Sequence, residues 1–256
     1  MAINVGANST LPGIRGRLFT DGRFEYIPIP ERSQTARSVP TYGDLEVAVP
    51  EELLDTEVHL DPSFPEVPGA TEYTYGDEHG VKAAPLGALD AGDMVWFYAS
   101  LSPVSGSIPW SPANWGAFII GEFRLEVDPL VSPELDAFAP SLRRRCVTNA
   151  HFARAEPDAR VLLLGDPDES RLLDRAVPLS STVGGVIPNR CVTYLSADSG
   201  RGPWWRRPLR FDPSGTSVLR ALIDRWQQLE EDAIDDVENT LESLERTGTH
   251  VPGDPP

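Results

Sequence analysis

The chain has 256 residues, of which 40% are hydrophobic, and this length and composition suit one large domain with a sizeable buried core. Asp and Glu number 39 against 22 Lys and Arg, which gives a formal net charge of −17. This balance excludes the long-range attraction of a basic protein to DNA or RNA, and no apolar run of about 18 residues is present to span a membrane. With no signal-peptide pattern at the start, we expect a cytoplasmic protein.

The surface composition is typical of a protein from a salt-loving archaeon. Lys82 is the only lysine, and every other basic residue is arginine. At about 1 M salt the Debye length is roughly 3 Å, so neighbouring acidic side chains barely repel one another. Binding to a nucleic acid in such salt would rest on local hydrogen bonds and stacking. The alternative is an ordinary acidic protein. Two cysteines, Cys146 and Cys191, do not form a disulfide framework, and we expect both to be reduced and buried.

The first ninety residues predict short elements joined by loops. Residues 1–31 indicate a strand, a Gly-rich turn and a hairpin at Asp21-Gly22. Residues 32–90 are rich in Pro, Gly and Asp, and we expect short helices there around 42–46 and 82–89.

Two strands are predicted in the middle of the chain. Residues 94–100 form the clearest strand, and residues 116–127 are the most apolar stretch. The second stretch begins as a continuous apolar run and alternates after Gly121, which predicts a strand that is half exposed beyond that glycine. We expect a bulge at Gly121.

Shorter elements follow. A short helix is expected within 132–150, a buried strand at 161–165, a helix of one or two turns at 170–176, and a further strand at 191–195.

The C-terminal part predicts an amphipathic helix over residues 214–246. Asp212-Pro213 supplies a cap and a proline at the first helical position, and apolar residues recur every three or four positions beyond it. We expect one face to dock on the body, with self-association through the distal half as the alternative. Residues 247–256 are expected to be disordered. Together these elements predict a single α+β domain over 1–246, built on a mixed, largely antiparallel sheet.

The common catalytic and cofactor motifs are absent. The sequence contains no phosphate-binding P-loop, dinucleotide fingerprint, Gly-x-Ser-x-Gly elbow or deaminase signature. No histidine pairs with another His or Cys at helical spacing, so local spacing predicts no metal site. The four histidines are His59, His79, His151 and His250. The cofactor stays unknown from the sequence.

The first candidate site is a cluster around residues 73–82. Asp77 and His79 are candidates for a general base, Lys82 for a phosphate ligand, and Tyr75 for substrate contact. The alternative interpretation is a polar turn that caps a helix at 82–89.

The second candidate is the segment 148–154. Asn149 and His151 are able to contact a base edge or a phosphate, with His151 also a candidate catalytic group. Local capping by Asn149 and a packed His151 form the alternative. Arg171 is a candidate clamp for a phosphate or carboxylate.

The third candidate is the segment 201–210, where four arginines and two tryptophans stand without an acidic residue. Trp204 and Trp205 would stack on a base, and Arg206 would pair with phosphate. The alternative is an anchor for the C-terminal helix with solvated arginines. Asn8 and Arg15, near a Gly-rich turn, are further binding candidates, with an ordinary loop as the alternative.

Several phrases in order carry a resemblance to a known family. They are Ile3-Asn4-Val5-Gly6-Ala7-Asn8-Ser9-Thr10, Thr41-Tyr42-Gly43-Asp44, His59-Leu60-Asp61-Pro62, Thr74-Tyr75-Gly76-Asp77, Gly92-Asp93 before Phe97-Tyr98-Ala99, and Asn149-Ala150-His151. The chain resembles the third type of nucleotide modification-associated domain over about residues 2–210. The resemblance implies an α+β fold and a role in nucleotide or nucleic-acid modification, without naming a reaction. Ser170-Arg171-Leu172-Leu173 is similar to the family as well.

A second resemblance covers the strands at 94–98 and 119–125, which are similar to the central strands of PUA-like domains that read modified bases.

Two functions therefore compete. A modifying enzyme predicts that Asp77, His79, Lys82, Asn149, His151 and Arg171 converge in one pocket. A modified-base reader predicts an aromatic slot, in which Trp96, Tyr98, Trp204 or Trp205 stacks on the base. A third alternative is an assembly subunit that works through the C-terminal helix.

Overall fold

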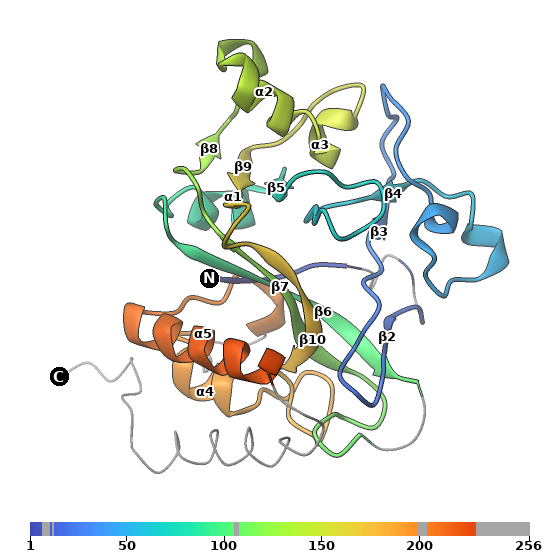
Figure 1. Cartoon of the computed structure of the whole chain (residues 1–256), viewed down its shortest axis with the longest axis vertical. Helices are drawn as coiled ribbons and strands as arrows, with labels where there is room; N and C mark the ends of the chain where they lie inside the picture. The colour runs from blue at the N-terminus through green and yellow to red at the C-terminus, as the bar shows by residue number, and fades with distance from the viewer. Residues whose placement is uncertain (7–10, 12, 105–107, 199–203, 229–256) are drawn as a thin grey trace.

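The computed structural model describes residues 1–6, 11, 13–104, 108–198 and 204–228. Its largest element is a five-stranded sheet, in which β6 pairs antiparallel with β7 and β7 pairs antiparallel with β10 (Figure 1). The two short N-terminal strands, β1 and β2, both pair parallel with β6, one beyond the other. The bounds are β1 (Ala2–Asn4), β2 (Gly16–Leu18), β6 (Met94–Pro103), β7 (Gly116–Arg124) and β10 (Arg171–Pro178).

Two smaller antiparallel sheets accompany this one. A three-stranded sheet has the order β5-β9-β8, and a two-stranded sheet pairs β3 with β4. The bounds are β3 (Ile29–Pro30), β4 (Val58–His59), β5 (Thr74–Asp77), β8 (Leu130–Val131) and β9 (Val161–Leu164). The predicted α+β fold with a largely antiparallel mixed sheet is confirmed. No closed barrel is found among the described strands, and the PUA-like middle stays a prediction.

Helices α2 to α5 lie in two groups at opposite ends of the molecule, and α1 lies between them beside β5. In Figure 1, α2 and α3 lie with the three-stranded sheet at one end, and α4 and α5 lie together at the other. The α-helices are α1 (Gly80–Leu86), α2 (Pro140–Cys146), α3 (Ala150–Ala153), α4 (Arg190–Leu195) and α5 (Pro213–Gln228). Short 3-10 helices are Tyr42–Leu45, Glu51–Leu53, Leu135–Ala137 and Trp204–Arg206. No described helix is long and apolar enough to cross a membrane.

Helix α5 begins where the sequence predicts. Asp212 caps it, since Oδ1 accepts a hydrogen bond of 2.7 Å from the backbone N–H of Gly215. Its buried face docks on the body and consists of Gly215, Leu219, Leu222, Ile223 and Trp226. The predicted residues 229–246 and the tail 247–256 lie outside the described part of the chain.

Two predicted elements have the wrong type. In the segment predicted as a helix at 170–176, residues 171–176 belong to strand β10, because they pair with β7, with Arg171 opposite the buried Glu122. Residues 191–195 belong to helix α4, because Asn189 caps the segment through the N–H of Val192 and the helix packs against α5. In both segments tertiary contacts outweigh the intrinsic preference of the residues.

Strand β7 is buried further than its alternating pattern predicts. A register shift opposite Phe97 and Tyr98 places a bulge beside Gly121, as expected. Glu122 is nevertheless buried, because its carboxylate accepts hydrogen bonds from Trp96 Nε1 at 2.9 Å and Arg171 Nε at 2.8 Å. The predicted exposure beyond Gly121 is therefore wrong at Glu122. Both cysteines are free and buried, as predicted.

Candidate functional site

Strand β5 carries one wall of a polar pocket. Its Thr-Tyr-Gly-Asp sequence is buried along its whole length. The carboxylate of Asp77 accepts hydrogen bonds from the Tyr75 hydroxyl at 2.9 Å and from the His79 N–H at 2.7 Å. Nζ of Lys82 lies 3.6 Å from the same carboxylate. Burial, with the nearby charge of Asp77, raises the pKa of Tyr75 well above its usual value, so the phenol stays a neutral donor.

Asp61 lies buried beside this strand. Its Oδ1 accepts hydrogen bonds from Nδ2 of Asn149 at 2.7 Å and from the Gly76 N–H at 3.0 Å. Its Oδ2 lies 3.2 Å from the same N–H and faces two imidazoles, at 3.6 Å from Nε2 of His151 and 3.9 Å from Nε2 of His59. The carboxylate is thus held firmly on one oxygen and directed toward both histidines with the other.

Helix α3 positions His151. Asn149 caps this helix, because its Oδ1 accepts a hydrogen bond of 3.0 Å from the backbone N–H of His151. The Nδ1 atom of His151 lies 2.7 Å from Asp158 and 3.3 Å from Glu78. Burial lowers the pKa of His151, but the hydrogen bonds and charges of Asp61, Asp158 and Glu78 outweigh it and raise the pKa to about 9.

His59 faces His151 edge to face, with the ring centroids 4.8 Å apart and the planes at 88°. Its Nδ1 lies 2.7 Å from Oε2 of Glu31. Burial raises the pKa of Glu31, yet the hydrogen bonds from His59, the Ser33 backbone and Arg154 lower it to about 2. The Arg154 guanidinium bridges the two ends of the cluster, 3.2 Å from Glu31 and 2.5 Å from Asp158.

A glycine allows these groups to approach β5. A Cβ atom at Gly76 would lie 2.6 Å from Cδ2 of His151 and 2.9 Å from Oδ1 of Asn149. Only a residue without a side chain fits between the strand and helix α3. Close packing of strand β5 against helix α3 therefore requires the glycine of the Thr-Tyr-Gly-Asp sequence.

We call the cavity formed by these residues the polar pocket. Its volume is about 380 Å³, and it opens to the surface beside His79, whose side chain is exposed. The residues that line it are Asn4, Val5, Gly6, Ile29, His59, Asp61, Tyr75, Gly76, Asp77, Glu78, His79, Lys82, His151 and Arg154.

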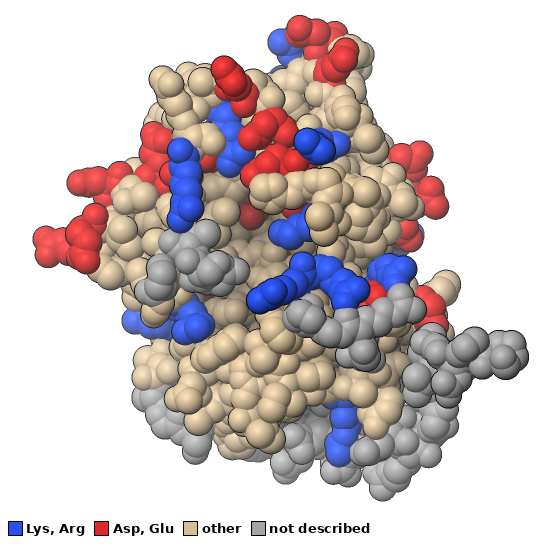
Figure 2. All heavy atoms as spheres, turned by 180° about the vertical axis from the view of Figure 1, so that it is seen from behind, with Lys and Arg blue, Asp and Glu red and all other residues tan. Residues whose placement is uncertain are grey.

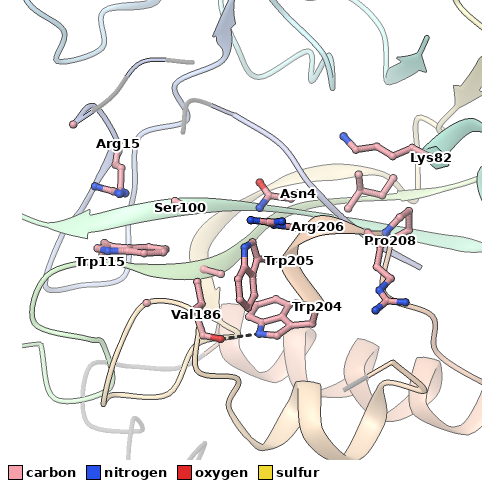
Figure 3. A pocket seen from close by; sticks show the side chains of 15 residues that line it. Asn4, Arg15, Lys82, Ser100, Trp115, Val186, Trp204, Trp205, Arg206 and Pro208 are labelled. Carbon is pink, nitrogen blue, oxygen red and sulfur yellow. Dashed lines mark hydrogen bonds between the residues drawn. The ribbon is translucent and has the colours of Figure 1, made fainter. Parts of the chain in front are cut away.

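A second cavity, the aromatic pocket, lies next to it and has a volume of about 630 Å³. Figure 3 shows Trp115 and Trp205 on different parts of its wall, with Arg15 over Trp115 and Arg206 beside Trp205. The Arg15 guanidinium carbon lies 4.6 Å from the centre of the Trp115 ring. The residues that line this pocket are Ile3, Asn4, Gly13, Arg15, Lys82, Ser100, Trp115, Ala117, Gly185, Val186, Trp204, Trp205, Arg206, Arg207 and Pro208.

The two pockets share part of their walls. Asn4 on strand β1 and Lys82 on helix α1 line both of them. The buried Oδ1 of Asn4 has no hydrogen-bond partner among the described residues. A polar atom buried in this way is costly unless a ligand or water satisfies it, so it marks a place where a donor group would bind.

Several basic side chains lie close together on the face of the molecule that Figure 2 shows. Figure 2 shows Lys and Arg gathered across the middle of this face, although acidic residues outnumber basic ones over the whole chain. Arg15, Lys82, Arg206 and Arg207 line the aromatic pocket, and its described lining contains no Asp or Glu. The aromatic pocket therefore suits an anionic ligand with a planar group.

The structure brings most of the predicted site residues to these two pockets. The polar pocket contains Tyr75, Asp77, His79, Lys82 and His151 in its wall, with Asn149 behind it. The aromatic pocket contains Arg15, Lys82, Trp204, Trp205 and Arg206.

Three predicted residues lie elsewhere. Tyr98 is buried behind Trp204, with the ring centroids 5.7 Å apart, and lines neither pocket. Arg171 extends toward Glu122 and Asp224, with Nη2 2.6 Å from Asp224, so it does not converge with the others. Trp96, suggested for stacking, is fully buried in the core. Asn8 lies outside the described residues.

Sequence reasoning missed His59, Asp61 and Glu31 as site residues, and it left Trp115 in a loop without a role. The sequence does contain a pattern that indicates His59 and Asp61. His59 and Asp61 stand two positions apart in an extended segment, a spacing that places both side chains on the same side of the chain. A spacing of two residues is not a helical spacing, so the pattern of metal ligands expected on a helix does not include it.

Comparison with known proteins gives one match. A family model described as nucleotide modification associated domain 3 matches residues 1–221. No curated protein matches the chain, and no solved structure matches it.

Proposed function

The chain belongs to the nucleotide modification associated domain 3 family, and we propose that it is an enzyme that modifies a nucleotide base held between the aromatic and polar pockets. The observation that carries the proposal is the shared wall at Asn4 and Lys82, which makes the two pockets neighbouring parts of one cleft. One ligand of nucleotide size is able to contact both parts.

The aromatic pocket supplies binding. Trp205 is half buried and lines the cavity, so part of its ring is free to stack on a base, which contributes roughly 1–3 kcal/mol. Arg206 and Lys82 carry the positive charge that a phosphate needs. Trp204 serves mainly as a support, since it is buried and its Nε1 donates a hydrogen bond of 2.8 Å to Val186.

The polar pocket supplies the chemical groups. His59, Asp61 and His151 meet there from two separate segments, and Asp77 stands beside Lys82, which lines both pockets. Histidines and carboxylates held in a buried pocket are the residues that enzymes use for proton transfer and for metal binding. The enzyme hypothesis predicts from sequence that six residues converge. Four of them line this pocket, Asn149 lies behind it, and Arg171 does not join them; the four are Asp77, His79, Lys82 and His151.

One observation favours a second candidate, a reader of modified bases without catalysis. Asn4 lines a pocket with three tryptophans and its buried Oδ1 has no partner among the described residues, and such an amide oxygen would accept a hydrogen bond from the edge of a base. This function needs the aromatic pocket alone. It leaves the buried cluster around Asp61 without a role.

Nucleoside analysis separates the two functions. We expect mass spectrometry of nucleosides from host DNA and tRNA to show one modified nucleoside that disappears when this gene is deleted. Complementation with Asp61→Asn or Trp205→Ala should fail to restore it, while the folded variants accumulate normally. Arg206→Gln should also fail to restore it, because Arg206 lines the aromatic pocket. Its matched control is Arg144→Gln, which should restore the nucleoside, because Arg144 is exposed on α2 and lines neither pocket.

An unchanged nucleoside profile would refute the enzyme. The reader would then predict that the purified chain binds an oligonucleotide with the modified base, in molar KCl to suit the acidic surface. That binding should be lost with Trp205→Ala and retained with Asp61→Asn.

A further inference from the structure

We infer that the polar pocket binds one divalent first-row transition metal ion through Nε2 of His59, Oδ2 of Asp61 and Nε2 of His151. The ligand atoms of these residues lie within 4.8 Å of one another, and the three residues are 5%, 8% and 1% exposed. This inference rests on the proposed function for the role of the ion, but the binding itself stands on the geometry.

The separations between the ligand atoms suit a single ion. Bonds from Zn²⁺ to His nitrogen or carboxylate oxygen are about 2.0–2.2 Å long, so two ligand atoms on one ion lie roughly 3.0–3.5 Å apart. Asp61 Oδ2 is 3.6 Å from Nε2 of His151 and 3.9 Å from Nε2 of His59. Both separations are slightly wider than this range, and all three ligand atoms lie within 4.8 Å of one another, so the side chains would close by up to roughly 1 Å around an ion.

The outer ring nitrogens of both histidines are engaged by carboxylates. Glu31 lies 2.7 Å from Nδ1 of His59, and Asp158 lies 2.7 Å from Nδ1 of His151. Because an ionised carboxylate only accepts hydrogen bonds, it keeps a proton on Nδ1, so Nε2 is the nitrogen that would give up its proton and coordinate an ion. Arg154 lies further from the two Nδ1 atoms, at 3.3 and 3.4 Å, and instead braces the carboxylates. Carboxylate–histidine–metal chains are the usual outer shell of such centres.

Asp61 is oriented in the same way. Asn149 and the Gly76 N–H hold its Oδ1 at 2.7 and 3.0 Å, which directs Oδ2 toward the imidazoles. The charge balance also calls for a cation, since Glu31, Asp61, Glu78 and Asp158 surround the histidines with Arg154 as the nearby arginine. Carboxylates at this density are stable when a metal ion or a proton neutralises them.

A second cluster in the same pocket is less suited to an ion. Glu78, His151 and Asp158 also lie within reach of one another, but Asp158 is exposed. Its two oxygens are engaged, one by His151 and the other by Arg154. We therefore assign Asp158 to the outer shell.

Two imidazoles and one carboxylate select first-row transition ions over Mg²⁺ and Ca²⁺, which prefer oxygen ligands. Three protein ligands leave coordination positions open to the pocket, as in catalytic metal sites. Because the polar pocket adjoins the aromatic pocket at Lys82, a group of the bound nucleotide would be able to reach the ion.

The test is a titration of the full chain, stripped of metal with a chelator, with Zn²⁺ by calorimetry and with Co²⁺ by visible absorption in molar KCl. We expect one site per chain and Co²⁺ bands typical of nitrogen and oxygen ligands. His59→Ala and His151→Ala should weaken Zn²⁺ binding by more than 100-fold, and Glu31→Gln by about 10–100-fold, as loss of an outer-shell partner does. His79→Ala is the matched control, because this histidine lines the same pocket with an exposed side chain, and it should leave the affinity unchanged.

The Asp61→Asn variant separates loss of the metal ligand from loss of folding. The amide keeps an oxygen for the Asn149 and Gly76 hydrogen bonds and removes the charged ligand, so circular dichroism should be native while Zn²⁺ binding is lost. Binding that is absent in the parent chain, or equally strong in the folded His59, Asp61 and His151 variants, would overturn the inference. Zn²⁺ binding with an unchanged nucleoside profile would refute the proposed enzyme and leave the metal site standing. A modified nucleoside produced by a chain that binds no metal would refute the metal site and leave the proposed enzyme standing.

Discussion

Removing the Asn149 side chain should destabilise the protein more than removing any ordinary helix cap. Its amide donates to the Asp61 carboxylate at 2.7 Å and to the Thr74 hydroxyl at 3.1 Å, and its oxygen accepts from the His151 N–H at 3.0 Å. A hydrogen bond to a charged group contributes about 1.5–3 kcal/mol and a neutral one about 1 kcal/mol. We expect Asn149→Ala to lower the free energy of unfolding by about 4 kcal/mol.

Asn189 provides the matched control. It caps helix α4, accepting from the Val192 N–H at 3.3 Å and donating to the Pro178 carbonyl at 2.6 Å, but it contacts no charged group through these bonds. Asn189→Ala should therefore cost about 2 kcal/mol. Urea unfolding in molar KCl, with equal m-values for the three proteins, measures both changes. Equal losses in the two variants, or a loss below about 1 kcal/mol for Asn149→Ala, would refute the idea that Asn149 holds a charged Asp61.

Other changes should act on packing, on thiol ionisation and on ligand binding. Gly76→Ala should lower the free energy of unfolding by about 1–3 kcal/mol and weaken Zn²⁺ binding, because the added Cβ would lie 2.6 Å from the His151 ring; calorimetry and urea unfolding measure both. Burial raises the pKa of Cys146 to about 11 and that of Cys191 to about 12, so neither thiol should react with a disulfide reagent at pH 8 until urea unfolds the chain. These pKa values in the folded protein exceed that of a thiol in the unfolded chain. Each thiol's contribution to stability is therefore complete below about pH 8.5 and is lost as the pH rises toward 11–12. Urea unfolding at several pH values measures this loss. Trp205→Ala should weaken nucleotide binding by roughly 5–150-fold in both dilute and molar salt, as fluorescence titration would report.

The sequence predicted the parts of the fold that depend on local pattern. The strands at 94–100 and 116–127 and the capped start of α5 follow from apolar periodicity and from Asp212-Pro213, and the structure confirms them. The segments at 170–176 and 191–195 were assigned the wrong type. Their structure is decided by partners far away in sequence: strand β7 for the first segment and helix α5 for the second.

The site was predictable to a similar extent. Asp77, Lys82 and His151 stand in polar phrases that attract notice by composition, and they lie together in the polar pocket. His59 and Asp61 stand in an apolar strand end, and their importance comes from Glu31 and Asn149, which approach from other elements. Local spacing carries no information about such contacts, because the fold creates them.

Lys82 links the charge of the chain to the arrangement of the cleft. A surface that uses arginine almost throughout keeps its only lysine where the aromatic and polar pockets meet, with Nζ 3.6 Å from Asp77. An ammonium group is compact and rotates on a flexible stem, whereas the planar fork of arginine needs partners on a fixed plane. Where the two pockets meet, the Lys82 ammonium is able to neutralise Asp77 or to rotate toward an anion in the aromatic pocket while occupying little space. The same compactness explains why a guanidinium would be a poor substitute there, although it carries the same charge.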